Sequence, residues 1–169
     1  MSKQIMSCLI LVCSLCSATP SFSAEDATLS PLAQQAKSIV KAAHAYVLEH
    51  SDDMDAVQKV LLTDPRFRDD GNGLYVFLYC YNFEKQEAIC CGHGTRKEFL
   101  GKNMWNLKTP NGRMLFRETS EKIEENPKIW IEYEWLHPMR KIIQTKKSYI
   151  MRIVVKKEQK AFIGCGFWK

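Results

Sequence analysis

The stretch Trp130-Ile131-Glu132-Tyr133-Glu134-Trp135 alternates two kinds of side chain, and the fold of the rest of the chain can be worked out from it. Strict alternation predicts a β-strand, because successive side chains of a strand point to opposite faces of the sheet. Tyr133 and Trp135 then share one face with Ile131, and Trp130 lies on the other face with two glutamates. Such a strand can wall a small-molecule pocket with aromatic rings, or it can pack the same rings into a core.

Upstream of this strand, the sequence predicts two helices. Ser30 offers a capping hydroxyl, Pro31 suits the first helical position, and apolar residues then recur at helical spacing until about His50. Ser51 can cap a second helix, which Pro65 ends.

Five segments, the opening stretch among them, have the composition of β-strands. They cover residues 74–81, 87–91, 129–135, 148–156 and 161–168, and a short helix is expected over 114–123. Strands that follow one another closely favour antiparallel hairpins, and the helices would cover one face of the sheet. The sequence therefore predicts an α+β fold, with a five-stranded antiparallel sheet and a long N-terminal helix.

The first 24 residues differ in kind from the rest of the chain. Lys3 precedes an apolar run over residues 5–16, and small residues follow as far as Ala24, which is the layout of a secretory signal peptide. The apolar run is too short to span a bilayer, which takes roughly 20 residues. We therefore expect a signal peptide over residues 1–24 and a single domain over 25–169. The mature chain would be periplasmic or secreted and would not span a membrane.

Four cysteines follow the expected signal peptide, and they are the disulfide candidates: Cys80, Cys90, Cys91 and Cys165. Export places them in an oxidising compartment. Cys90 and Cys91 point to opposite faces if both lie in a strand, so they are not expected to pair with each other. Cys80 can meet either of them across a hairpin, and the sequence leaves the pairing open. The four cysteines lack the CxxC spacing of zinc sites, so no metal is expected.

Nine short segments follow one another along the chain in an order and spacing that indicate a family. They are Asp64-Pro65-Arg66-Phe67-Arg68, Gly73-Leu74-Tyr75-Val76-Phe77, Gly92-His93, Gly101-Lys102-Asn103, Pro110-Asn111-Gly112, residues 130–135, Pro138, Lys146-Lys147-Ser148-Tyr149, and Gly164-Cys165-Gly166. Over residues 30–168 the chain resembles the single Cache domains, extracytoplasmic sensing modules with a PAS-like fold. The resemblance implies one ligand pocket between the sheet and its flanking loops. Members typically bind small organic acids or similar polar metabolites, and they usually belong to chemoreceptors or sensor kinases.

By position, the resemblance implies a set of ligand-binding residues: Tyr75, His93, Asn103, Trp130, Tyr133, Trp135, Lys146 and Tyr149. Lys146 would pair with a ligand carboxylate, because a carboxylate in a dry pocket is costly without a partner. Strand alternation favours Tyr133 and Trp135 as pocket residues, together with Lys146 and Tyr149 of the next strand. It makes Trp130 the residue best suited to the core.

These observations predict an exported, sensory ligand-binding domain with no output domain of its own. It would bind a small organic acid or similar metabolite and act through a partner, such as a membrane receptor or kinase. The alternative is a secreted structural or interaction protein that keeps the Cache fold without a ligand. Glu132 and Glu134 have no base or nucleophile near them in the sequence, so no enzymatic activity is expected, and no cofactor is implied. The net charge of +5 is mild, and an exported chain is not expected to bind nucleic acid.

Overall fold

The structure is a computed structural model that describes residues 29–169. The expected signal peptide, residues 1–24, lies outside the described residues. Among the described residues, no helix combines the length and the apolar character needed to cross a membrane.

Two helices begin the described part of the chain. Helix α1 spans Pro31–His50, and the hydroxyl of Ser30 caps its first turn as expected. Helix α2 spans Met54–Thr63. The cap of α2 is the carboxylate of Asp53 and not the hydroxyl of Ser51, which instead ends α1.

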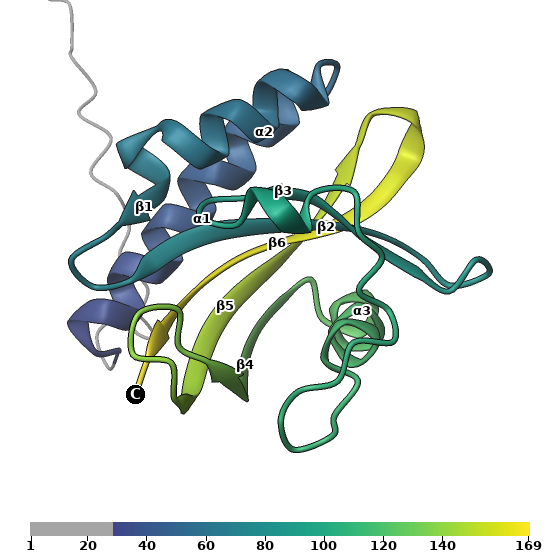
Figure 1. Ribbon diagram of the computed structural model, residues 1–169. Coiled ribbons are helices and arrows are strands. Elements are labelled where there is room, and N and C mark those ends of the chain that lie inside the picture. The colour runs from purple at the N-terminus through teal and green to yellow at the C-terminus, as the bar shows by residue number, and fades with distance from the viewer. Residues whose placement is uncertain (1–28) are drawn as a thin grey trace, which may run out of the picture.

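The strands form one antiparallel sheet, with a third helix inserted between the third and fourth strands. The elements are β1 (Arg68–Asp69), β2 (Leu74–Asn82), β3 (Glu87–His93), α3 (Leu115–Glu125), β4 (Lys128–Leu136), β5 (Ile143–Val155) and β6 (Gln159–Trp168). The strand order is β1-β2-β6-β5-β4, and β3 pairs with β2. Strand β6, the last in the sequence, therefore lies at the centre of the sheet, between β2 and β5 (Figure 1).

The α+β fold with five long antiparallel strands and a long N-terminal helix is confirmed, with three differences in detail. The two-residue β1 was expected to be loop, and it pairs with the start of β2. Strand β5 begins five residues earlier than expected, because its start continues the pairing with β4 as far as Leu136 and Ile143. Helix α3 does not share a face with α1 and α2.

The two faces of the sheet have separate cores. Helices α1 and α2 cover one face, which we call the α1 face (Figure 1), and their apolar side chains meet Leu78, Ile163 and their neighbours there. Helix α3 packs on the opposite face, which we call the α3 face, through Leu115, Phe116 and Ile123. The second core is rich in tyrosines, whereas the first is mainly aliphatic.

Candidate ligand-binding site

The α3 face encloses a small cavity between the sheet, α3 and the loop that follows β3. Its lining is mostly aromatic and consists of Tyr75, Phe77, Tyr79, His93, Phe99, Leu115, Phe116, Tyr133, Trp135 and Lys146. The cavity volume is about 40 Å³, a few times the roughly 10–15 Å³ that one water molecule needs. An apolar, aromatic wall around a few polar groups is the usual makeup of a small-molecule site.

Two glycines of β6 leave room for this arrangement. A Cβ atom on Gly164 would collide with the ring of Phe77, and one on Gly166 would collide with the hydroxyl of Ser148. The central strand therefore presents bare backbone to the α3 face at these positions. Side chains from the neighbouring strands β2 and β5 lie across it.

Lys146 of β5 is the charged group of the cavity, and its side chain is 1% exposed. Its Nζ lies 3.8 Å from the ring centroid of Tyr75 and 5.8 Å from that of Phe77. Within residues 29–169, no carboxylate forms an ion pair with this ammonium group. Burial lowers the pKa of Lys146, because the charged form loses its hydration. The ring faces replace only part of that hydration, so the site favours a bound anion.

His93 ends β3 and contributes a neutral imidazole to the cavity. Its Nδ1 accepts hydrogen bonds from the backbone N–H groups of Thr95 at 3.2 Å and Arg96 at 3.1 Å. The ring proton is therefore on Nε2, which can donate to a ligand. Burial first, and then the positive charges of Lys146 and Arg96, lower the pKa of His93 to about 3. The imidazole thus stays neutral at physiological pH.

Two of the three tyrosines in the lining, Tyr75 and Tyr133, lie beside Lys146. The hydroxyl of Tyr133 lies 3.0 Å from that of Ser148, which fixes its position beside Lys146. The ring of Tyr75 lies 5.0 Å from the ring of His93, between the imidazole and the ammonium group. Burial raises the pKa of both phenols, so both remain hydrogen-bond donors.

The structure brings together five of the eight residues that the sequence singled out: Tyr75, His93, Tyr133, Trp135 and Lys146. Trp130 and Tyr149 lie instead on the α1 face, where their ring centroids are 5.0 Å apart. Asn103 is exposed, and its amide is used by backbone groups. It accepts from Ala88 N and Trp105 N and donates to the carbonyl of Gln86, which holds the loop against β3.

The sequence interpretation missed several lining residues: Phe77, Tyr79, Phe99, Leu115 and Phe116. Phe77 and Tyr79 follow Tyr75 at intervals of two along β2, so the alternation used for β4 would have found them. The other three come from a loop and from α3, and no local pattern marks them.

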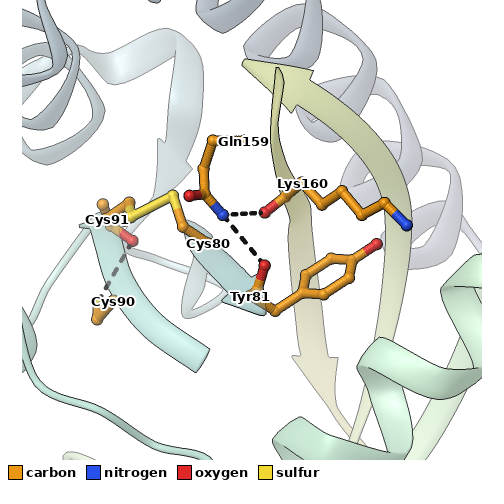
Figure 2. Close-up of a disulfide and its surroundings, with 7 residues drawn as sticks. Cys80, Tyr81, Cys90, Cys91, Gln159 and Lys160 are labelled. Atoms are coloured by element: carbon orange, nitrogen blue, oxygen red, sulfur yellow. Dashed lines mark hydrogen bonds between the residues drawn. A yellow bond between two sulfur atoms is a disulfide. The ribbon is translucent and has the colours of Figure 1, made fainter. Parts of the chain in front are cut away.

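The cysteines divide between the two faces of the sheet. Cys80 and Cys91 form a disulfide between β2 and β3, as Figure 2 shows. Cys90 and Cys165 are buried thiols. Cys90 points into the core of the α3 face, where Sγ bonds to the carbonyl of Gly92, while Cys165 belongs to the core of the α1 face. Within the described residues, no cluster of His, Cys, Asp or Glu side chains could hold a metal ion.

A sheet with α1 and α2 on one face, and with α3 and an aromatic cavity on the other, has the architecture of a PAS-like module. The profile of the family Single Cache domain 2 matches residues 23–167, and the chain therefore belongs to the single Cache domain family.

Solved structures with the same fold come from chemosensory proteins. The periplasmic sensor domain of a chemotaxis protein is 20% identical with a TM-score of 0.63, over 83% of this chain and 99% of that one. A methyl-accepting chemotaxis protein from Vibrio parahaemolyticus is 17% identical with a TM-score of 0.62, over 80% of this chain and 87% of that one. A Cache chemosensory domain, described for its carboxylic acid recognition, is 14% identical with a TM-score of 0.61, over 80% and 92% of the two chains. The comparison with curated proteins gave no match.

Proposed function

We propose that this chain is an exported ligand-binding domain that holds a small organic carboxylate against Lys146. The observation that carries the proposal is a fully buried ammonium group without an acidic partner among residues 29–169. A carboxylate would supply the missing charge. His93 Nε2–H and the hydroxyls of Tyr75 and Tyr133 would donate to its oxygens.

The size of the cavity favours a short ligand. A volume of about 40 Å³ leaves little space for a chain beyond the carboxylate itself. Acetate, propionate, lactate and pyruvate are therefore suitable probes. Longer acids would have to displace Phe99 or Leu115, which close the cavity from outside the sheet.

A sensory role through a partner is the second part of the proposal. The structural relatives named above are a sensor domain of a chemotaxis protein, a methyl-accepting chemotaxis protein and a Cache chemosensory domain that was described for carboxylic acid recognition. We propose that residues 1–24 are a signal peptide, that residues 25–169 act in the periplasm or outside the cell, and that a membrane receptor or kinase reads the bound state. Binding fits the site better than catalysis, because Glu132 pairs with Lys147 and Lys169 away from the cavity.

Thermal denaturation with carboxylate probes tests the ligand. A carboxylate at 100 times its Kd should stabilise the wild type by about 2.7 kcal/mol, which raises Tm by roughly 5–10 °C. Lys146→Met should abolish this shift, and it should raise the stability of the free protein because a buried charge is removed. Lys147→Met is the matched control, since its side chain points to the opposite face and pairs with Glu132.

Two results would contradict the proposal. If no short carboxylate moves the wild-type Tm, the chain has kept the fold without this ligand. That result would support the alternative of a structural or interaction protein. If Lys146→Met keeps the full shift, the ligand binds elsewhere.

A further inference from the structure

The turn between β4 and β5 exposes an unusual number of apolar side chains. We call residues 136–143 the β4–β5 hairpin. Four of its side chains are large, apolar and exposed, namely Leu136, Met139, Ile142 and Ile143, and Met139 is 84% exposed. They make up half of the eight exposed large apolar residues in the described chain. Such clustering on a surface marks a contact site more often than scattered apolar residues do.

Hydrogen bonds hold this hairpin in one shape. The backbone N–H of His137 donates to the carbonyl of Ile142 at 2.8 Å, and Lys141 N donates back to the carbonyl of His137 at 3.0 Å. The ring Nδ1 of His137 accepts from Met139 N and Arg140 N, both at 3.2 Å. The same ring lies 4.5 Å from that of Trp168 at the end of β6. Met139 and Ile142 are therefore presented by a braced turn.

Positive charge surrounds the exposed apolar side chains. Arg140 and Lys141 occupy the tip, and neither forms an ion pair with any residue in the range 29–169. No acidic residue occurs in the sequence between Glu134 and Glu158. Next to the tip is an open groove of about 960 Å³. The three other cations that line it, Arg68, Arg96 and Lys169, pair with Asp70, Glu98 and Glu132, so the unpaired charge of this region is that of the tip.

We propose that the β4–β5 hairpin docks the domain on an anionic phospholipid surface. Met139 and Ile142 would enter the boundary between headgroups and acyl chains, and Arg140 and Lys141 would contact the phosphates. Apolar side chains flanked by cations are the composition of interfacial membrane-binding segments. A protein partner would instead need a continuous interface of about 800 Å² on each side, and the apolar side chains here belong to a single turn.

The position of the hairpin in the fold suits this role. It lies at the end of the sheet where the described chain finishes at Lys169 and near the N-terminal end of α1 (Figure 1). Docking there would leave α2 and the Cys80–Cys91 edge away from the lipid. The ligand proposed above plays no part in this inference.

Vesicle co-sedimentation tests the proposal. The purified protein is used with its N-terminus defined by mass spectrometry. It is mixed with vesicles of phosphatidylcholine alone or of three parts phosphatidylglycerol to one part phosphatidylcholine. We expect binding to the anionic vesicles that weakens steeply between 0.1 and 1 M salt, as screening shortens the range of the attraction.

Two double variants separate the charge from the apolar contribution. Arg140→Gln with Lys141→Gln should lower the partition coefficient about 25-fold, since each cation near an anionic surface contributes about fivefold. Met139→Ser with Ile142→Ser should lower it by about tenfold or more. Lys122→Gln with Lys128→Gln, and Leu48→Ser with Val154→Ser, are the matched controls, because these residues are exposed elsewhere.

Three outcomes would overturn the proposal. The first is an absence of binding to anionic vesicles, and the second is equal loss in the control variants. The third is a concentration-dependent dimer that Met139→Ser with Ile142→Ser abolishes without any effect of lipid, which would assign the hairpin to a second copy of the chain.

Discussion

The two faces of the sheet are built from the same strands but carry different chemistry. The core of the α1 face is mainly aliphatic, and the aromatic pair Trp130 and Tyr149 packs against it. The α3 face buries a lysine, a histidine and several tyrosines around a small space. The α1 face therefore contributes mainly hydrophobic burial, whereas the α3 face also bears the cost of burying polar groups.

Ile163→Ala tests the first half of this comparison. Ile163 is fully buried in the core of the α1 face, so the truncation leaves a cavity and should lower the free energy of unfolding by about 2–5 kcal/mol. Urea denaturation measures the loss. Val154→Ala, at an exposed position of β5, should change stability by less than about 0.5 kcal/mol.

The same variant also tests whether the two faces are independent of each other. If the two faces are independent, Ile163→Ala should leave the Tm increment produced by a bound carboxylate unchanged. A smaller increment would mean that the packing of the α1 face supports the cavity directly.

Acid titration of His93 tests the other half of the comparison, the cost of burying polar groups on the α3 face. Its folded-state pKa of about 3 lies below its ordinary value of 6.5, so between these values the unfolded chain binds a proton that the folded chain does not. Stability is therefore lost as the pH falls, by about 3 kcal/mol between pH 6.5 and pH 4. His93→Asn should reduce this pH dependence of the free energy of unfolding. The side-chain oxygen of the asparagine can replace Nδ1 as a hydrogen-bond acceptor. His50→Asn, on the exposed end of α1, should keep the pH dependence.

This prediction depends on how steeply the free energy of unfolding falls between pH 6.5 and pH 4, whatever the absolute stability of each variant. An unchanged slope in His93→Asn would show that the acid sensitivity of the α3 face comes from another group.

Gly166→Ala tests the contribution of β6, the central strand, to the packing of the α3 face. The new Cβ would meet the hydroxyl of Ser148 and the carbonyl of Lys147 on the α3 face, so we expect a loss of about 1–3 kcal/mol. It should also displace the hydroxyl of Tyr133 and weaken carboxylate binding, measured by calorimetry. Gly71→Ala, whose nearest contact would be 3.4 Å away, is the control and should leave both quantities near the wild-type values.

Much of the fold followed from periodicity and capping. Alternation in the 130–135 segment assigned Tyr133 and Trp135 to one face and Trp130 to the other, and this division is confirmed. The burial of Lys146 did not follow from the sequence. The segment around it is basic, and a basic segment is typical of an exposed strand end. Only the tertiary contact with the rings of β2 shows why it is inside.

The placement of Tyr149 shows what positional resemblance alone leaves out. Lys146 and Tyr149 are three residues apart, and an odd spacing on one strand puts side chains on opposite faces. Tyr149 therefore lies against the α1 face while Lys146 lines the cavity. The loop residue Phe99 and the helix residues Leu115 and Phe116 could not be placed at all, because their contacts depend on how distant segments pack.

The unpaired ammonium group of Lys146 has a consequence for the proton balance of binding. In the free domain burial lowers its pKa, whereas a carboxylate seated at Nζ would raise it. Binding then draws a proton from the solvent wherever the free amine is partly neutral, so the measured heat should vary with the ionisation enthalpy of the buffer. If the proposed carboxylate binds at Lys146, its apparent affinity should therefore depend on pH as well as on the fit of the ligand to the cavity.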